Sequence, residues 1–583
     1  MAGTRRIVPR GDLEGSIGSG EKRWAKAYIG NVSVTYDTVA DMVADLELRK
    51  DTSARTKGFA NVNDNGAAFY NIREKTVSDV DDGGSIIFLD NGDVAELITD
   101  GTANVKQFGA VGDNTHDDTA AFQKAIDSGF DVFIPTSNGE KYKITSTLTV
   151  ANPRCKRIYG EEYGKFRNHG GIFYTNTDAD APLFDIQIEG CNILNLTFNG
   201  ADMEGTFMNA HRTWDGNAYA DVDVRIQDCR IMSFRYGFKF IGRGLEVINN
   251  SFANIRFLAL LNWVDAEESL NTHPAQFGQR AIRFVGNRMH MIYTQGVYVQ
   301  SGHAYGFQFI DNLIDNGRMV DHLIRCENEA WNWLISGNTV NGLQSTTVFN
   351  FQSGIKNSII SNNVITADPL YWSGSSNIIG MFMNLIGCNG LTIQDNAVDY
   401  ITNNLISCSG TIKGLNVSGN NFSNVGGNGI AFDSISSTGN IAVCGNNFEF
   451  SSDQNSHYIL YSTNSATKTI NNSFCHDNTG NATDILNLVI IEEPLLNSWG
   501  IHLIPTGTDL NTLTQSGRYA PQNSSAASTL VNCPVSAGFI LEVNRRFGSY
   551  VGTQTIYSGS RIYCRSYSSS GWGNWFQYTG AQV

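Results

Sequence analysis

The chain has 583 residues, more than one ordinary domain holds, with 17% charged residues, 11% aromatic residues and 59 glycines. This composition is typical of a rigid, turn-rich β protein and excludes a disordered chain. The net charge of −15, with no Lys/Arg block of five, argues against nucleic-acid binding, and without a run of 18 apolar residues no membrane insertion is expected.

The ten cysteines are scattered, and none forms a CxxC or a Cys/His spacing suited to a metal ion. We therefore expect no disulfide, no structural metal and no cofactor, in a chain synthesised in a reducing cytoplasm. The N-terminal sequence has no apolar core after its basic residues, so it does not look like a secretion signal.

The N-terminal third predicts small modules. Residues 1–35 form a Gly-rich segment around the sequence KRW, which is too short to bury a core alone and should need partners. Residues 36–103 begin with a helical stretch, TVADMVADLE, and continue with short strands and turns, which predicts an α+β unit.

The segment VKQFGAVGDNTHDDTAAFQKAID (105–127) predicts a strand, a Gly/Asp turn and an amphipathic helix. Asp117, Asp118 or Thr119 can cap that helix. Its apolar face should close the open end of the fold that follows, because an uncovered end would be sticky. The residues of that face are Ala121, Phe122, Ala125 and Ile126.

From about residue 190 to 480 one phrase returns, mostly every 24–26 residues: apolar, any, apolar, polar, Gly/Asp/Asn, Asn, any, apolar. Such a period marks a solenoid, and the alternation marks strands with one buried face. The fold class is therefore all-β, a right-handed parallel β-helix, which we place at 104–492. Sandwiches and barrels also use Asn-Gly turns, but they do not keep one residue type in one slot across so many repeats.

The repeated asparagine should form a stacked amide ladder in tight corners that accept left-handed backbone. This role is structural, so none of these residues is assigned to a site. The corner positions are Asn250, Asn287, Asn312, Asn338, Asn363, Asn396, Asn420, Asn446 and Asn472, with Leu196 and Cys229 in two earlier, degenerate copies.

From Glu493 the composition becomes rich in Ser, Gly and Tyr. Segments such as GFILEVNRR, YVGTQTIYS and SRIYCRSYSSSGWGNWFQY read as antiparallel strands. Residues 493–583 are therefore predicted to form a separate C-terminal β knob, used for trimerisation or carbohydrate binding.

Several of these segments resemble segments of a known protein family, and they follow one another in the same order as in that family. GAVGDNTHDDTAAFQKAID resembles the motif that opens pectate-lyase-like β-helices, common in bacteriophage tailspikes and capsule depolymerases. YDTVADMVADLELRKDTSARTKGF is similar to their neck unit, and GSIGSGEKRWAKAYIGNVSV is similar to a virion-anchoring segment. LNTLTQSGRYAP and GSRIYCRSYSSSGWGNWFQY resemble a knob at the tips of phage tail fibres.

The resemblance implies a homotrimeric receptor-binding protein in the phage tail. It would attach to other virion proteins through its N-terminus and act at the bacterial surface on capsular polysaccharide or O-antigen. The family has no shared catalytic motif, so no active residue is carried over, and Asp117 and Asp118 are structural there.

The outward residues of the strands point to a groove. Counting from the corner asparagine, positions −5 and −3 are apolar and should face inward, so Trp333 is expected in the core, while −4 and −2 face out. A second strand recurs before each repeat (GVYVQSG, LIRCEN, VFNFQSG) and stacks two more outward residues per rung, in neighbouring columns, at about 4.8 Å spacing. The first column at −4 begins Arg225, Glu246, Arg283, Gln308; the second-strand columns are Tyr298, Arg325, Asn350 and Gln300, Glu327, Gln352.

Acids and aromatic residues concentrate between about 211 and 333, where we expect sugar to bind. Glycosidases need two carboxyl groups, one protonated and one charged. The candidate catalytic acids are Glu327, the first choice, with Glu246, Asp315, Glu267 and Glu268 as partners. The candidate substrate-binding residues are Arg325, Gln300, Gln352, Tyr298, His303, Tyr305, Trp331, Trp263, Trp214 and Arg283.

Three functions remain open at this point. The first is a glycoside hydrolase that depolymerises surface polysaccharide. The second is a polysaccharide lyase that removes a proton next to a uronic carboxylate, with His303, Tyr305 and Arg325 able to serve. The third is a non-catalytic adhesin. The reaction products separate them, since a lyase leaves an ultraviolet-absorbing unsaturated sugar, a hydrolase leaves only new reducing ends, and an adhesin leaves nothing.

Overall fold

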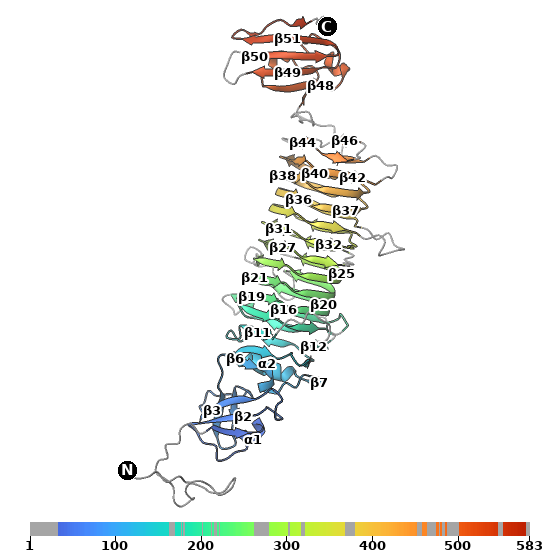
Figure 1. Cartoon of the computed structure of the whole chain (residues 1–583). Coiled ribbons are helices and arrows are strands. Elements are labelled where there is room, and N and C mark those ends of the chain that lie inside the picture. The colour runs from blue at the N-terminus through green and yellow to red at the C-terminus, as the bar shows by residue number, and fades with distance from the viewer. Residues whose placement is uncertain are drawn as a thin grey trace, which may run out of the picture. The chain divides into compact units, whose positions relative to one another are not determined.

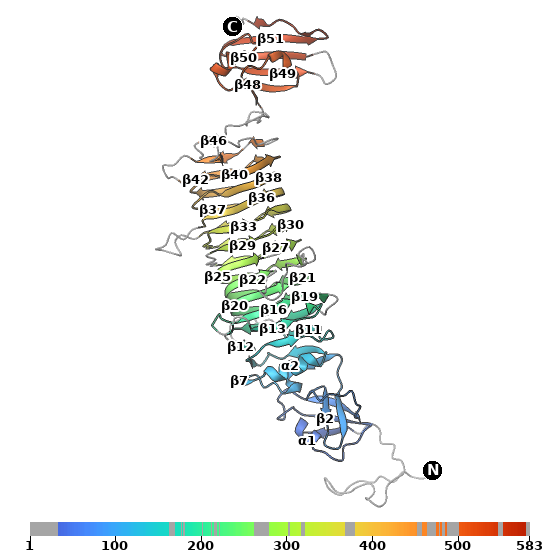
Figure 2. The same cartoon turned by 180° about the vertical axis from the view of Figure 1, so that it is seen from behind.

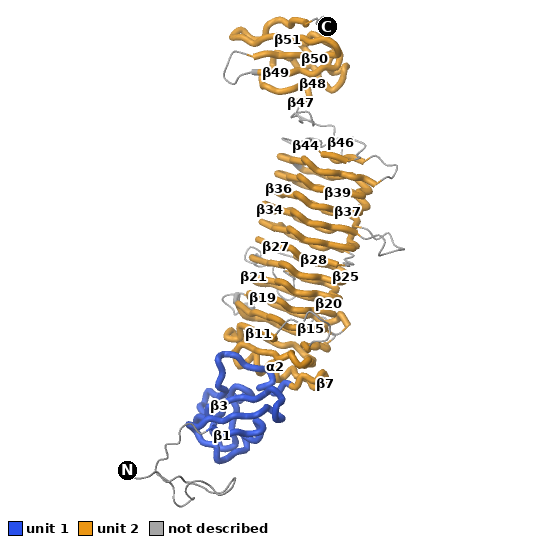
Figure 3. The backbone as a smooth tube through the Cα atoms, viewed as in Figure 1, with its two compact units in different colours: residues 1–110 blue, residues 111–583 orange. Residues whose placement is uncertain are grey.

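In the computed structural model, the chain forms two compact units, residues 1–110 and 111–583 (Figure 3). The structure describes residues 33–161, 170–176, 178, 181–200, 202–211, 213–214, 219–220, 222–261, 279–300, 304–315, 321–367, 379–451, 457–462, 474–476, 478–480, 484–486, 501–545 and 552–578. The expected virion-anchoring segment, 1–35, lies almost wholly outside the described residues. The boundaries of the four predicted domains stay predictions.

Within residues 33–97 the first unit holds a five-stranded sheet in the order β1-β2-β3-β5-β4 and one short helix. The helix, α1 (Val39–Val43), begins where predicted, because Thr38 and Asp41 form a reciprocal capping box. Val39 and Met42 are buried against the sheet. The strands are β1 (Ser33–Tyr36), β2 (Thr52–Thr56), β3 (Ala68–Glu74), β4 (Ile86–Phe88) and β5 (Asp93–Leu97).

The second unit opens with the predicted amphipathic helix, α2 (Thr119–Asp127), whose expected apolar face is buried. Asp118 stands at the N-cap position but makes no capping bond. It accepts hydrogen bonds from the backbone N–H groups of Val111 (2.6 Å) and Gly112 (3.1 Å) instead. Of the three candidate caps, Asp117 acts at the helix start, since its Oδ1 accepts from the Thr119 N–H at 3.1 Å.

Beyond α2 the chain is a parallel β-helix. Successive coils stack through parallel strand pairs in a large continuous sheet (Figures 1 and 2). Each described coil contributes strands to three sheets, which we call A, B and C in the order in which the chain reaches them from the start of a repeat.

Sheet A precedes the corner asparagine, sheet B follows it, and sheet C closes the coil. Sheet A contains β11 (Arg157–Gly160), β14 (Cys191–Leu194), β19 (Asp223–Gln227), β21 (Gly244–Ile248), β24 (Ile282–Val285), β27 (Gln308–Ile310), β31 (Leu334–Ser336), the ends of β34 (Ile355–Ser361), β36 (Met381–Gln394) and β38 (Ile406–Ser418), then β41 (Ala442–Cys444) and β44 (Phe474–His476).

Sheet B contains β9 (Lys141–Ile144), β12 (Gly171–Tyr174), β15 (Thr197–Asn199), the first halves of β20 (Arg230–Ile241), β22 (Ser251–Leu261) and β25 (Arg288–Val299), then β28 (Leu313–Asp315), β32 (Thr339–Asn341), β35 (Val364–Thr366), β37 (Ala397–Ile401), β39 (Asn421–Val425), β42 (Asn447–Phe450) and β45 (Thr479–Gly480). Sheet C contains β10 (Leu148–Val150), β13 (Pro182–Ile186), β16 (Thr206–His211), the second halves of β20, β22 and β25, then β29 (His322–Cys326), β33 (Thr347–Phe351), the first halves of β36 and β38, β40 (Ile430–Gly439), β43 (Tyr458–Ser462) and β46 (Asp484–Leu486).

The corner between sheets A and B is the predicted left-handed turn. The residue before each corner position has positive φ, for example 55° at Asn249 and 67° at Gly286. The asparagine behind it is buried, and its Oδ1 accepts from the preceding rung. Asn250 donates from its backbone N–H and its Nδ2 to Asn287 Oδ1 at 2.9 and 3.1 Å. The amide ladder therefore satisfies polar groups that the tight corner would otherwise bury without partners.

The ladder runs as predicted from Asn250 to Asn446, but its last predicted member is wrong. The next rung is closed by Asn478, whose Oδ1 accepts from the Asn446 N–H at 3.0 Å, not by Asn472, which lies outside the described residues. The strand that pairs with β41 is β44, with Cys475 opposite Val443. Burial of Cys475 on that core residue sets the register.

The interior of the helix is filled by the −5 and −3 residues, as predicted. Trp333 is 1% exposed and packs on Phe307 with ring centroids 4.5 Å apart. Such a close-packed interior holds each coil rigidly on the next, so the outward side chains have fixed positions.

Residues 501–545 and 552–578 form a seven-stranded sheet, described here by itself. It is antiparallel as predicted, except that β47 pairs with β48 in parallel. Its strands are β47 (Ile501–Ile504), β48 (Gly517–Pro521), β49 (Ile540–Arg545), β50 (Gly552–Ser558), β51 (Arg561–Ser568), β52 (Gly571–Trp572) and β53 (Phe576–Tyr578). Among the described residues, no helix is long and apolar enough to cross a membrane.

Candidate functional site

The outward positions of sheet A form the predicted column. Arg225, Glu246, Arg283 and Gln308 are successive strand partners. Arg225 Nε donates to Glu246 Oε2 at 2.7 Å, and Arg283 Nη1 lies 3.0 Å from Glu246 Oε1. Arg283 Nε donates to Gln308 Oε1 at 3.0 Å. Both oxygens of one carboxylate are therefore held between two guanidinium groups.

This arrangement fixes the charge of Glu246. Burial alone would raise its pKa, but the hydrogen bonds and charges of Arg225 and Arg283 outweigh burial and lower the pKa below the usual value. Glu246 is thus a carboxylate at neutral pH. It can act as a base or stabilise positive charge, but it does not serve as a proton donor.

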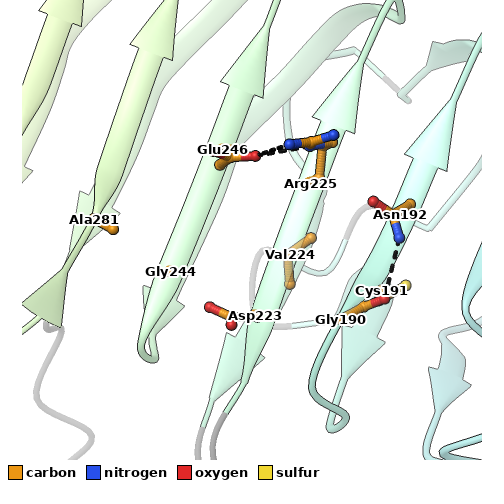
Figure 4. A pocket seen from close by; sticks show the side chains of 9 residues that line it. All are labelled: Gly190, Cys191, Asn192, Asp223, Val224, Arg225, Gly244, Glu246 and Ala281. Carbon is orange, nitrogen blue, oxygen red and sulfur yellow. Dashed lines mark hydrogen bonds and ion pairs between the residues drawn. The ribbon is translucent and has the colours of Figure 1, made fainter.

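The column borders a pocket of about 300 Å³ at the start of the sheet A strands (Figure 4). Its lining includes Asp223, Arg225 and Glu246. Asp223 stands opposite Gly244 on the next strand. A Cβ at Gly244 would collide with Asp223 Oδ1, so a glycine at this position leaves room for the carboxylate and for the hollow.

Asp223 was not among the predicted site residues. It comes two positions before Arg225 on β19, so strand alternation places both on one face. Glu246 lies on the neighbouring strand, two residues beyond Gly244, the partner of Asp223. The Cα atoms of Asp223 and Glu246 are therefore about 8 Å apart. The sequence could have indicated Asp223, because it is an acid six residues before the corner position Cys229. It therefore stands next to the charged −4 residues Arg225 and Glu246.

On sheet C the predicted second column is also in register, with Tyr298, Arg325 and Asn350 as successive strand partners. Arg325 forms an ion pair with Glu327 through Nη2 and Oε1, and its guanidinium lies 5.1 Å from the Tyr298 ring centroid. The Tyr298 hydroxyl donates to Glu327 Oε1 at 3.2 Å. Burial, followed by the charge of Glu327, raises the pKa of Tyr298.

The rung after Arg325 carries an amide network. Asn350 Oδ1 accepts from Gln352 Nε2 at 2.5 Å and from Asn384 Nδ2 at 2.9 Å, while its Nδ2 lies 2.6 Å from His322 Nε2. Gln300 directly follows β25, and its backbone N–H donates to the Leu261 carbonyl at 3.0 Å. Asn350 is therefore a direct strand neighbour of Arg325, as predicted. The side-chain amides of Asn350 and Gln352, however, already bond to each other.

Trp331 and Tyr305 lie where the chain passes from sheet C to sheet A. Their ring centroids are 5.8 Å apart, and the Lys356 ammonium lies 4.3 Å from the Trp331 ring centroid. Trp331 Nε1 donates to Glu329 Oε2 at 3.1 Å, and Glu329 pairs with Lys356 at 2.7 Å. Lys356 and Tyr305 therefore both lie against the Trp331 ring, and the assignment of Trp331 to substrate binding stays a prediction.

The structure describes two of the predicted acid partners of Glu327, and neither is brought to it. Asp315 lies on sheet B, where its Oδ2 is 3.8 Å from His290 Nδ1, and Glu246 lies on sheet A. The corners of each coil separate these sheets from sheet C. Glu329 follows Glu327 by two residues, but its carboxylate already pairs with Lys356 and accepts a hydrogen bond from Trp331.

The remaining predicted residues fall mainly outside the described part of the chain. These are Glu267, Glu268, Trp263 and His303. Trp214 is described only by its backbone, which pairs with Tyr219 in the hairpin of β17 (Thr213–Trp214) and β18 (Tyr219–Ala220). Among the described residues, no group of three or more His, Cys, Asp or Glu side chains is placed to hold a metal ion.

No family model matches the sequence, and no curated protein matches it. Solved structures similar to this chain include the gp42 tailspike of Acinetobacter phage vb_AbaP_AS12, at 11% identity and a TM-score of 0.46, covering 94% of each chain. The enzymatically active domain of tailspike protein 2 of bacteriophage CBA120 gives 11% and 0.38, covering 95% of this chain and 87% of that one. The tailspike of Acinetobacter baumannii phage AM24 gives 10% and 0.38, covering 94% and 84%.

Proposed function

We propose that this protein is a phage tail receptor-binding protein that depolymerises bacterial capsular polysaccharide or O-antigen by hydrolysing glycosidic bonds. The observation that carries the hydrolytic part is the pocket of sheet A, in which Asp223 and Glu246 line one hollow on neighbouring strands. The tail location, the attachment through the N-terminus and the homotrimer rest on the sequence motifs that resemble tailspikes.

The chemistry follows from the negative charge that the pocket favours on Glu246. Two arginines keep Glu246 ionised, which suits a general base that removes a proton from the attacking water. Asp223 would then protonate the departing glycosidic oxygen. In an inverting enzyme the two carboxyl groups stand roughly 6.5–9.5 Å apart and leave room for that water, whereas a retaining enzyme holds them at about 5–5.5 Å.

Sheet C supports hydrolysis less well. Glu327 is ion-paired with Arg325, but Asp315 and Glu246, the two predicted partner acids that the structure describes, lie on other sheets. Burial and the charge of Glu327 raise the pKa of Tyr298, so a tyrosinate base at this position is harder to form. We therefore assign sheet C to polysaccharide contact rather than to bond cleavage.

The test is depolymerisation by the full chain on a panel of capsule-typed and O-antigen-typed polysaccharides. Glu246→Gln and Asp223→Asn should each lose at least ~100-fold in rate with folding intact, and the products should carry new reducing ends and no ultraviolet-absorbing double bond. Glu449→Gln on sheet B, an exposed residue outside the pocket, is the matched control and should keep the wild-type rate.

Glu327→Gln decides between the two sheets. If it abolishes cleavage while Glu246→Gln does not, the reaction takes place on sheet C. Unsaturated products would replace the hydrolase with a lyase. Binding to a polysaccharide on the panel without any products would leave an adhesin.

A further inference from the structure

Asn192 occupies a position in the pocket of sheet A that matches the position of Glu246. Arg225 on β19 is the strand partner of Asn192 on β14 and of Glu246 on β21. The Cα atom of Asn192 is therefore about 8 Å from that of Asp223, the same spacing as for Glu246. An amide and a carboxylate thus flank Asp223 on opposite sides, and both line the pocket (Figure 4).

Asp223 has a glycine on each side, so the hollow extends in both directions from its carboxyl group. Toward Glu246 this glycine is Gly244, the strand partner of Asp223. Toward Asn192 it is Gly190, whose backbone N–H donates to the Asp223 carbonyl at 3.0 Å. A Cβ at Gly190 would approach no other described residue closer than 3.8 Å. The space between Asp223 and Asn192 is therefore free of side chains at the level of Gly190.

The amide of Asn192 has a fixed orientation that leaves an acceptor available. Its Nδ2 donates to the carbonyl oxygens of Gly190 at 3.1 Å and of Lys156 at 3.2 Å. These two acceptors identify the nitrogen, and Figure 4 shows it turned toward Gly190 with the oxygen turned the other way. No described residue donates a hydrogen bond to this Oδ1. A ligand that contacts Asn192 here must therefore bring a donor.

Arg225 leaves the Asn192 side of the pocket open. Its Nε and its Nη2 both donate to Glu246 Oε2, so the guanidinium group is turned toward β21. The positive charge of Arg225 is therefore offset by Glu246, and the hydrogen-bonding group that the column offers on the other side is the amide oxygen of Asn192.

The proposed reaction assigns the sugar that lies next to Asn192. In an inverting hydrolysis the water attacks from the face of the sugar ring opposite to the departing oxygen. Glu246 activates that water, and Asp223 protonates the glycosidic oxygen. The sugar that departs with this oxygen therefore lies on the side of Asp223 away from Glu246, which is the side of Asn192.

We propose that Asn192 selects the sugar on the leaving side of the bond, because its Oδ1 accepts a hydrogen bond from one hydroxyl group of that sugar. This inference rests on the proposed hydrolytic function and adds a specificity residue to it. A carboxylate, a sulfate or an O-acetyl ester at this position offers acceptors without a proton, so it finds no partner in Oδ1. The site therefore takes a sugar whose hydroxyl facing Asn192 is unsubstituted.

The test compares two substrates of the full chain. One is the polysaccharide of the panel that the protein cleaves, and the other is a para-nitrophenyl glycoside of the product oligosaccharide, in which an aryl group replaces the leaving sugar. Asn192→Ala should lower the ratio of kcat/KM on the polysaccharide to kcat/KM on the aryl glycoside at least ~10-fold. Glu246→Gln removes the base for both substrates and should slow both.

Asn416→Ala is the matched control. Asn416 is the same residue type in the same outward column of sheet A, several coils beyond the pocket, and its substitution should leave the ratio unchanged. The former leaving sugar stands at the new non-reducing end of each product, where nuclear magnetic resonance identifies its substituents. We expect at least one unsubstituted hydroxyl on it besides the one that cleavage releases.

The outcomes separate the role of Asn192 from the hydrolytic function. An unchanged ratio in Asn192→Ala overturns the proposal. If both rates fall together, Asn192 only supports the backbone at Gly190 and Lys156, and if neither falls, it does not contact the substrate. A leaving sugar with every other hydroxyl substituted also overturns it. If Glu246→Gln keeps wild-type rates on both substrates, the hydrolytic site itself is wrong, and the role of Asn192 is wrong with it.

Discussion

Asn446 donates both its backbone N–H and its Nδ2 to the Oδ1 of Asn478, at 3.0 and 2.9 Å, across 32 residues of sequence. The same two bonds join Asn338 to Asn363 across 25 residues, at 3.1 and 2.8 Å. The bonding at the corner is thus constant although the length of a coil is not. The corner therefore keeps the strands in register whatever the length of the coil.

The ladder should contribute measurably to stability. Asn338→Ala removes the acceptor for Asn312 and the donor to Asn363, and it leaves buried N–H and C=O groups without partners. We expect a loss of ~2–4 kcal/mol in the free energy of unfolding. The urea midpoint measures it. Asn341→Ala, on the exposed side of the next strand, should shift the midpoint little, and equal shifts in both variants would contradict a special role for the corner.

Cys229 offers the opposite experiment. It occupies a corner position, its N–H donates to Asn250 Oδ1 at 2.9 Å, and its Sγ lies 3.5 Å from the Ile193 carbonyl. Cys229→Asn places a stronger amide donor where the weak thiol donor stands, so we expect unchanged or higher thermal stability, by up to about 1 kcal/mol. Cys326→Asn, at a buried position outside the corner, should be clearly destabilising. A large loss at position 229 would show that the first rungs cannot accept the ladder.

His322 should make stability depend on pH. Burial, then the positive charge of Arg325, lowers the pKa of His322 from 6.5 to about 4. The unfolded chain takes up a proton as pH falls through 6.5, while the folded chain does so only near 4. Stability is therefore full above 6.5 and falls between 6.5 and 4, by on the order of 3 kcal/mol. Urea midpoints at several pH values should show a flatter profile for His322→Gln, whereas His116→Gln, at an exposed position, should keep the wild-type slope.

Arg283 should tune the base of the proposed reaction. Arg283→Met removes one of the two cations beside Glu246 while burial, which raises the pKa, remains. We expect the acid limb of the pH–rate profile to move up by about one pH unit, because more of Glu246 is then protonated at a given pH. Arg157→Gln is the control, since Arg157 belongs to the same column but pairs with Asp131. An unmoved acid limb in Arg283→Met would remove Glu246 from the role of base.

The repeat made most of the β-helix predictable from sequence. The tight corner needs one amide for its hydrogen bonds and therefore accepts few other residue types. The repeated asparagines from Asn250 to Asn446 thus indicate the register of the coils. The final rung was missed because two weak copies of the phrase overlap, one at Asn472 and one at Asn478. Only the packing of Cys475 over Val443 distinguishes them, and a short strand carries too little pattern to show it.

The candidate site was less accessible, because distance along the chain does not indicate a shared face. Asp315 and Glu327 are 12 residues apart but lie on sheets B and C. Asp223 and Glu246 are 23 residues apart, nearly one coil, and therefore line the same pocket. Recognising the second pair requires knowing where each coil turns, which the loops of unequal length conceal.

The uniform corner makes a whole coil, rather than a single residue, the unit in which this protein can change length. Removing one coil, such as the 25 residues that separate Asn338 from Asn363, would bring two equivalent asparagines into the same bonding position. The coils on either side would meet through bonds of the kind they already make. A lineage can therefore lengthen or shorten the β-helix in fixed steps, while each outward column keeps its alignment.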